Sequence, residues 1–262
     1  MNGFTAREVL PGVFHISDAM GVYMTLLAGE ERALLVDTGY GLDDVASYIG
    51  TVTGKPLTVM LTHAHHDHAL GARWFGDIRL FQQDLPAWPV YTGENQRRSV
   101  AAQAAAKGLF VPEDYLSAPM PVPSPIEEGE IDLGGMKAQV ILCPGHTMGS
   151  AAVYVPERQL LLTGDDWNPT TWLFFPEALP AKAYRENVRA LLGLPFAHVL
   201  CSHREALYPR AELEAFLDGL TDEALFAAKC VDMGRRIDTR EANPAPGQQF
   251  VFDFGKAFGH MP

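Results

Sequence analysis

Seven consecutive residues carry an unusual concentration of side chains that bind metal ions. The segment contains four imidazoles and one carboxylate: Thr62-His63-Ala64-His65-His66-Asp67-His68. Histidine nitrogen and aspartate oxygen are common ligands of zinc and of other divalent first-row metals. An apolar, β-prone run over residues 57–61 precedes the segment, so the ligands are expected where a buried strand leaves the core. The segment predicts a metal centre.

Side-chain direction divides this segment between two ions. In an extended chain, residues two positions apart point to the same side, so His63 and His65 can bind one ion together. Asp67 and His68 are adjacent and cannot share that direction. They fit better on a turn into a helix over residues 69–75, where they would face a second ion. The segment therefore predicts a two-metal enzyme.

Three other short apolar runs end in a His or an Asp. Residues 140–143 lead into Pro144-Gly145-His146-Thr147, residues 160–163 into Gly164-Asp165, and residues 198–201 into Ser202-His203. The order H-x-H-x-D-H, P-G-H-T, T-G-D and S-H resembles the metallo-β-lactamase superfamily of hydrolases. The V-D-T-G sequence at 36–39 matches that superfamily's first motif, and the resemblance extends from about Val9 to His203.

The resemblance implies a ligand set and a cofactor. One metal ion would bind His63, His65 and His146, and a second would bind Asp67, His68 and His203. Asp165 would bridge the two ions, and Asp37 would orient the ligand loops through hydrogen bonds. The cofactor is then two divalent metal ions, with zinc as the default and iron or manganese accepted by the same donors.

The resemblance also implies a mechanism, in which a hydroxide bridging the two metals attacks the substrate. Asp67 would be catalytic, orienting the hydroxide and then passing a proton to the leaving group. His66 is expected to face solvent or to support a ligand rather than bind metal. His15, His198 and His260 lie outside the motifs and are expected to be ordinary core or surface side chains.

The fold class that the resemblance implies is α/β, an αββα sandwich of two mixed β-sheets flanked by helices. The sequence predicts three strands within residues 9–36, a strand at 78–81, a strand pair within 131–163 turning at 133–136, and a closing strand at 250–254. Helices are expected at 41–53, 94–107, 181–192 and 210–236. Because the predicted ligands span positions 63 to 203, we expect residues 1–262 to form one domain. Residues 82–125 would be either a lid over the metals or a surface insertion.

An aromatic segment follows the predicted bridging ligand. Trp167, Trp172, Phe174 and Phe175 could form the apolar wall of a substrate pocket, although core packing would explain one or two of them. The predicted substrate-binding residues are Trp167, Asn168, Trp172 and Phe174.

Composition excludes several classes of partner. The chain has 262 residues, and its 20 basic and 32 acidic residues give a net charge of −12, the wrong sign for binding a nucleic-acid backbone. No apolar run approaches the roughly 20 residues of a membrane span, and Met1 to Arg7 does not resemble a signal peptide. Three cysteines suit a reducing compartment, so a cytoplasmic location is expected. The sequence carries no indication of oligomeric state.

The predicted activity is metal-dependent hydrolysis of a small acyl substrate: an ester, a thioester or a lactone. The ligand set is similar to that of the glyoxalase II and lactonase branches. A phosphodiester or phosphonate hydrolase is the alternative and would need cations at the pocket mouth, for which Arg97 and Arg98 are candidates. A β-lactamase is less favoured because those relatives generally lack an Asp bridge. A non-catalytic metal-binding protein would usually have lost ligands.

Overall fold

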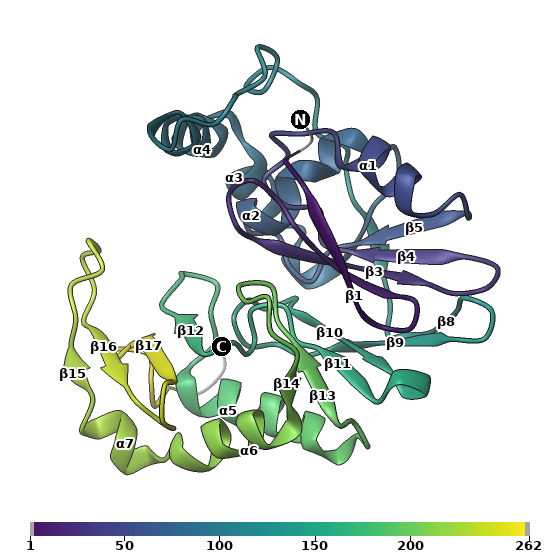
Figure 1. Ribbon diagram of the computed structural model, residues 1–262. Helices are drawn as coiled ribbons and strands as arrows, with labels where there is room; N and C mark the ends of the chain where they lie inside the picture. The colour runs from purple at the N-terminus through teal and green to yellow at the C-terminus, as the bar shows by residue number, and fades with distance from the viewer. Residues whose placement is uncertain (1–2, 260–262) are drawn as a thin grey trace.

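In the computed structural model, which describes residues 3–259, two β-sheets face each other and a smaller third sheet lies at one end (Figure 1). The strands of sheet A follow chain order: β1 (Thr5–Leu10), β2 (Val13–Ser17), β3 (Tyr23–Ala28), β4 (Ala33–Val36), β5 (Leu57–Met60), β6 (Arg79–Phe81) and β7 (Ser124–Ile126). Sheet B has the order β14 (Tyr208–Pro209), β13 (His198–Leu200), β11 (Leu160–Leu162), β10 (Ala151–Val155), β9 (Lys137–Leu142) and β8 (Gly129–Asp132). Sheet C has the order β12 (Thr170–Leu173), β17 (Gln249–Asp253), β16 (Thr239–Ala242) and β15 (Lys229–Cys230).

Alternating side chains of the inner strands divide between two layers of core. In β4, Leu34 and Val36 pack with residues of sheet B, whereas Leu35 packs towards the helices on the other side. In β10, Val153 faces sheet A and Tyr154 faces the helices below sheet B. Because successive side chains of a strand point to opposite faces, a strand that is apolar at every position must be covered on both sides.

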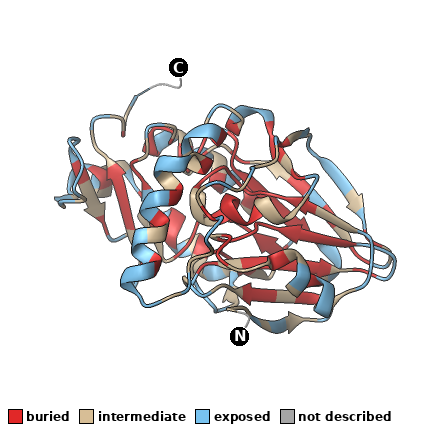
Figure 2. Cartoon of the chain, turned by 90° about the horizontal axis from the view of Figure 1, so that it is seen from above, coloured by how far each residue is buried: buried red, intermediate tan, exposed pale blue. Residues whose placement is uncertain are grey.

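Helices cover the outer faces of the two sheets (Figures 1 and 2). The segments α1 (Val45–Val52), α2 (His66–Ala69), η1 (Leu70–Trp74), α3 (Trp88–Thr92) and α4 (Glu94–Ala106) lie on the sheet A side, with the short η2 (Gln82–Asp84) between β6 and α3. The segments α5 (Ala181–Ala190), α6 (Arg210–Gly219) and α7 (Asp222–Phe226) lie on the sheet B side, where η3 (Pro156–Arg158) and η4 (Leu191–Gly193) connect strands and helices. The arrangement confirms the predicted αββα sandwich. Within residues 3–259, no helix is both long and apolar enough to cross a bilayer.

Two predictions of local structure were wrong. Four strands rather than three occupy the N-terminal region, because the carboxylate of Asp18 accepts hydrogen bonds from the amides of Met20, Gly21 and Val22 and makes a tight turn there. The helix predicted over 210–236 is two helices followed by a strand. The Thr221 hydroxyl accepts a hydrogen bond from the amide of Ala224 and starts α7, so the chain changes direction after α6.

The last strands of the chain connect its C-terminal part to the loop after Asp165. The strand predicted at 250–254 is β17, which pairs in parallel with β12 and antiparallel with β16. The strand β12 begins five residues after Asp165. Sheet C therefore ties residues 229–253 directly to the segment that follows a predicted ligand.

His15 on β2 holds the end of the loop that carries His203. Its ring lies 3.2 Å from the Thr25 hydroxyl and 3.0 Å from the carbonyl oxygen of Arg204, and it stacks on Tyr23. Burial lowers the pKa of His15 to about 4. The ring is therefore neutral in the folded protein at pH values where a free histidine would be protonated. His260 lies outside the described residues.

This burial predicts a pH-dependent stability. As pH falls through 6.5, the unfolded chain takes up a proton at His15 while the folded chain does not, so the free energy of unfolding decreases between about pH 6.5 and pH 4. At pH 5 this difference in proton uptake at His15 lowers the free energy of unfolding by about 2 kcal/mol relative to neutral pH. The free energy of unfolding can be measured with denaturant at pH 7.5 and at pH 5. Between these pH values it should decrease less in His15→Gln than in wild type, because the glutamine side chain does not take up a proton.

The difference between the two proteins isolates His15 because both contain the other buried histidines. His198→Gln is a matched control, since His198 lies on β13 with a half-buried ring and no side-chain hydrogen bond among residues 3–259. Equal pH dependence in wild type and His15→Gln would contradict the interpretation.

Candidate metal centre

The predicted ligands lie on four loops that leave the ends of β5, β9, β11 and β13. Asp67 and His68 lie on the helix α2 itself rather than on a turn before a helix over 69–75. His63 and His65 lie on the irregular segment between β5 and α2 rather than on an extended strand. Gly164, directly before Asp165, has a positive φ of 52°, and a Cβ there would lie 2.8 Å from that of Thr62. A glycine is therefore required where these two loops meet.

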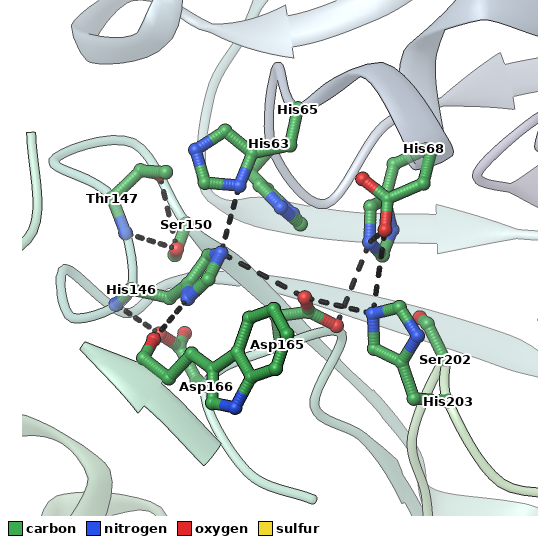
Figure 3. A network of polar contacts seen from close by, with 12 residues as sticks. His63, His65, His68, His146, Thr147, Ser150, Asp165, Asp166, Ser202 and His203 are labelled. Carbon is green, nitrogen blue, oxygen red and sulfur yellow. Dashed lines mark hydrogen bonds and ion pairs between the residues drawn. The ribbon is translucent and has the colours of Figure 1, made fainter. Parts of the chain in front are cut away.

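The loops bring the predicted ligands into two adjacent groups (Figure 3). In each group, the ligand atoms all lie within 4.8 Å of one another. The first group is His63, His65 and His146, and the second is Asp67, His68, Asp165 and His203. The sequence analysis assigned the residues of the first group to one ion and Asp67, His68 and His203 to the other, with Asp165 as a bridge.

Hydrogen bonds on the outer side of each ring leave one nitrogen of every first-group imidazole free. His146 Nδ1 lies 2.7 Å from the carbonyl oxygen of Trp172 and must donate to it, because a carbonyl only accepts. His65 Nε2 lies 2.5 Å from the Glu177 carboxylate. His63 Nδ1 lies 3.0 Å from the hydroxyl of Thr62. The inward atoms are then His63 Nε2, His65 Nδ1 and His146 Nε2, each with a lone pair.

Two of these inward nitrogens face each other. His65 Nδ1 and His146 Nε2 lie 2.8 Å apart, a distance at which either a shared proton or a cation must separate their lone pairs. His63 Nε2 is buried and has no hydrogen-bond partner among the described residues. Buried polar atoms without partners are rare in folded proteins, so the three nitrogens fit a metal ion.

The second group combines two imidazoles with two carboxylates around Asp165. His203 Nε2 lies 3.0 Å from Asp165 Oδ2 and 3.5 Å from Asp67 Oδ2. His68 Nε2 lies 3.5 Å from Asp165 Oδ1, and neither atom has a hydrogen-bond partner among the described residues. Asp165 Oδ2 also lies 3.7 Å from His146 Nε2 in the first group. Asp165 therefore lies between the groups, where a bridging ligand would have to be (Figure 3).

The two groups differ in their electrostatics. Burial and neighbouring imidazoles hold the pKa of His63 well below 6.5 and lower the pKa of His146 to about 4, so both rings are neutral. Burial alone would raise the pKa of Asp165, but His203 and His68 outweigh it and hold that pKa well below its usual range. Burial opposes protonation of His68 and His203, but Asp165 and Asp67 outweigh it and raise the pKa of both rings. Neutral imidazoles and ionised carboxylates bind metal ions, so the first group is in a metal-binding state, whereas His68 and His203 would release protons on binding.

Two buried carboxylates join the loops behind the site. Asp37, which the sequence analysis expected to orient the loops, accepts hydrogen bonds from the Thr62 amide at 2.7 Å and from His68 Nδ1 at 2.9 Å. Asp84, which was not predicted, accepts from the amides of Ala64 and Gly149, both at 2.8 Å. Asp84 therefore connects the His63–His65 loop to the loop after His146. No motif points to Asp84, because its partners are amides that any residue supplies.

The aromatic segment after Asp165 divides between core and site. Trp167 is fully buried and bonds Gln248, so its prediction as a pocket residue was wrong. Asn168 is buried and caps a turn by accepting from the Thr170 amide, so it does not reach a substrate either. Trp172 is 42% exposed, whereas Phe174 is 4% exposed and stacks against Phe175.

The first-group side of the site contains Phe175, which the sequence analysis placed in the apolar wall, and two residues that it did not predict, Glu177 and Tyr91. The ring of Phe175 lies 4.5 Å from that of His65 and 5.1 Å from that of His146. Glu177 accepts hydrogen bonds from His65 and from the hydroxyl of Tyr91 on α3. His66 lies beside this group, with its ring against Tyr40 and Tyr91, and belongs to neither set of ligand atoms.

Comparison with known proteins assigns the family. Residues 17–203 match the sequence profile of the Metallo-beta-lactamase superfamily. The chain belongs to this superfamily. It is a metal-dependent hydrolase by family, and the two groups of His and Asp side chains are the part of the fold suited to divalent metals.

Individual relatives are similar at low identity. The acyl-coenzyme A thioesterase MBLAC2 of Bos taurus is 25% identical over 171 residues, which cover 55% of this chain and 60% of the relative. The hydroxyacylglutathione hydrolase of Yersinia enterocolitica is 27% identical over 196 residues, 74% of this chain and 66% of the relative. The chain thus spans less than two thirds of each. The solved structure of TTHA1623 in a di-iron-bound form is 30% identical, with a TM-score of 0.55, and the match covers 74% of this chain and 92% of that one.

The contact between Glu177 and His65 predicts an effect on metal affinity. Burial would raise the pKa of Glu177, but its hydrogen bonds to His65 and Tyr91 lower that pKa to about 2, so an ionised carboxylate fixes the His65 ring. Glu177→Ala should weaken zinc binding by the first group about 10- to 100-fold, because a carboxylate partner fixes the tautomer and raises the basicity of a histidine ligand. Competition with a chromogenic chelator would measure the change.

Glu186→Ala is the matched control for this experiment. Glu186 lies on the exposed face of α5 and contacts no ligand. Zinc affinity that is the same in Glu177→Ala, Glu186→Ala and wild type would show that the contact does not support the ligand.

Proposed function

We propose that this chain binds two divalent metal ions and hydrolyses carboxylic thioesters. One observation carries the two-metal part: the seven predicted ligands converge from four loops into two adjacent groups. Three of their buried atoms, His63 Nε2, His68 Nε2 and Asp165 Oδ1, have no hydrogen-bond partner among the described residues. Three lone pairs of the first group and the mixed set of the second fit two ions with Asp165 between them. Zinc is the default for these donors, and the di-iron form of TTHA1623 makes iron the first alternative.

The residues of the chain would divide the work of hydrolysis. Divalent ions in these positions polarise a carbonyl and lower the pKa of water towards neutrality. Asp67 is the group that would accept and return a proton. Burial opposes its ionisation, but His68, His66 and His203 lower its pKa, so the carboxylate is charged and free to accept. Its side chain is 13% exposed, which leaves it accessible from the site.

The preference for thioesters rests on chemistry and on relatives. The Phe175 ring packs against two first-group imidazoles, and the exposed Trp172 ring packs against Phe174, the neighbour of Phe175. Together they form a small apolar wall that suits an acyl chain. Two relatives of this chain bear the names of thioester hydrolases. An ester or a lactone would fit the same reaction, and both belong in the test.

The cations that the phosphodiester alternative required are engaged elsewhere. Arg97 is buried and donates to the carbonyl oxygens of Tyr115 and Ala118. Arg98 pairs with Glu94 on the exposed face of α4. Neither is free to bind a phosphate at the metal centre, so these two arginines give the phosphodiester alternative no support.

The test combines metal analysis with a substrate panel. Purified protein should contain close to two metal equivalents by elemental analysis and should hydrolyse thioesters faster than aryl esters, lactones or phosphodiesters of similar size. Chelation should abolish turnover, and one of zinc, iron or manganese should restore it. Asp165→Asn should lower kcat at least about 100-fold, since one residue would serve both ions. If the protein contains two equivalents of metal but does not hydrolyse any acyl substrate, the proposed activity is refuted and the proposed two-metal site is supported.

Trp172→Ala tests the apolar wall separately from the metals. The contact between Trp172 and His146 uses the main-chain carbonyl, so this substitution should leave the metal content unchanged. We expect the KM for a long-chain thioester to rise about 5- to 20-fold, consistent with the loss of one buried aromatic contact of 1–2 kcal/mol. Trp172→Phe should recover most of the effect. Unchanged KM values would remove Trp172 from the binding site.

A further inference from the structure

The loop that joins β15 to β16, residues 231–238, reaches the aromatic side chains beside the first group. The guanidinium carbon of Arg235 lies 5.1 Å from the centre of the Phe174 ring and 5.0 Å from that of Phe175. These two rings stack on each other with centres 4.8 Å apart, and Phe175 in turn packs against His65. One aromatic ring therefore separates Arg235 from a predicted metal ligand.

Arg235 is a cation without an anionic partner. Eight other arginines pair with a carboxylate within 4.0 Å, but among residues 3–259 Arg235 forms neither an ion pair nor a hydrogen bond. The carboxylate on this side of the site, Glu177, already accepts from His65 and Tyr91. The guanidinium donors remain available to a ligand, while the aromatic faces hold the side chain in place.

The position of Arg235 relative to the site is set by sheet C. The strand β15 pairs with β16, β16 with β17, and β17 with β12. The strand β12 includes Trp172, whose carbonyl oxygen accepts from His146. Burial raises the pKa of the Tyr91 phenol, and the charge of Arg235 is close enough to act against that rise. The cation thus faces the same side of the site as Tyr91 and Phe175.

We propose that Arg235 binds an anionic group, a carboxylate or a phosphate, on the leaving-group portion of the substrate. The inference rests on the proposed thioesterase function and narrows it to thioesters of anionic thiols. A planar guanidinium can hold either oxyanion through two parallel hydrogen bonds. With a net charge of −12, the chain as a whole repels such substrates, so an unpaired cation beside the metals would have a large effect on recognition. Arg235 lies outside residues 17–203, which match the family profile, so the specificity that it would confer is not a feature of that profile.

The kinetic test uses three thioesters with the same acyl group. The thiols are glutathione, which carries carboxylates, coenzyme A, which carries phosphates, and N-acetylcysteamine, which is neutral. The wild type should have a lower KM for at least one anionic thioester than for the neutral one. Arg235→Gln should raise that KM about 10- to 100-fold, the cost of losing a charged hydrogen bond, with a much smaller change in kcat. The KM for the neutral thioester should change much less.

The adjacent arginine provides a matched control. Arg236 has the same charge and is exposed in the same loop, but no aromatic ring lies under its guanidinium among the described residues. Arg236→Gln should therefore leave the preference for the anionic thioester close to that of wild type. Equal losses in the two variants would assign the effect to overall charge and overturn the proposal.

A binding measurement separates this proposal from the proposed activity. Calorimetry with S-butylglutathione and S-butyl-coenzyme A, thioethers that cannot be hydrolysed, should show binding to metal-loaded wild type and about 10-fold or greater weakening in Arg235→Gln. Binding that depends on Arg235 without turnover of any thioester would keep the anion site and overturn the thioesterase function. Turnover of thioesters with the same KM in wild type and Arg235→Gln would keep the thioesterase function and overturn the anion site. Absence of both binding and turnover would overturn both.

Discussion

The buried carboxylate of Asp37 is the contact on which the geometry of the metal centre depends. It accepts from the amide and hydroxyl of Thr62, from His68 Nδ1 and from the hydroxyl of Ser202. These partners lie directly before His63, within the second group, and directly before His203. One side chain thus connects two of the four ligand loops, those after β5 and β13. Its own backbone lies in the left-handed region, at a φ of 67°. Strain of this kind persists only where the surrounding contacts require it.

The same principle recurs in the first group of ligands. Every first-group imidazole is anchored on its outer nitrogen by a group that fixes the tautomer: the Thr62 hydroxyl, the Glu177 carboxylate or the Trp172 carbonyl. The inward lone pairs are therefore oriented before any ion binds. Preorganisation of this kind lowers the cost of assembling a charged site and favours one coordination geometry over others.

The two groups divide electrostatic work between them. Three imidazole ligands would leave the full charge of a bound ion available to polarise a substrate, whereas two carboxylates would compensate most of the charge of an ion in the second group. Asp165 lies between the groups and couples them. The Phe175 and Phe174 rings connect the first group to Arg235, so the predicted ligands, the two aromatic rings and the cation are in contact one after another.

The sequence alone was enough to predict many features of the candidate site and of the fold. The ligand types and their order, the strands that precede them and the layered fold could be predicted, because metal binding needs donor atoms that few residue types supply and because strand and helix periodicities are local. Glu177 and Asp84 could not be predicted, since they meet their partners across 112 and 65 positions of sequence through groups that carry no motif. The roles of Trp167 and Phe175 likewise depend on which face of a short strand or turn points to the core. Only tertiary packing decides that, because burial of one aromatic side chain excludes its neighbour from the same space.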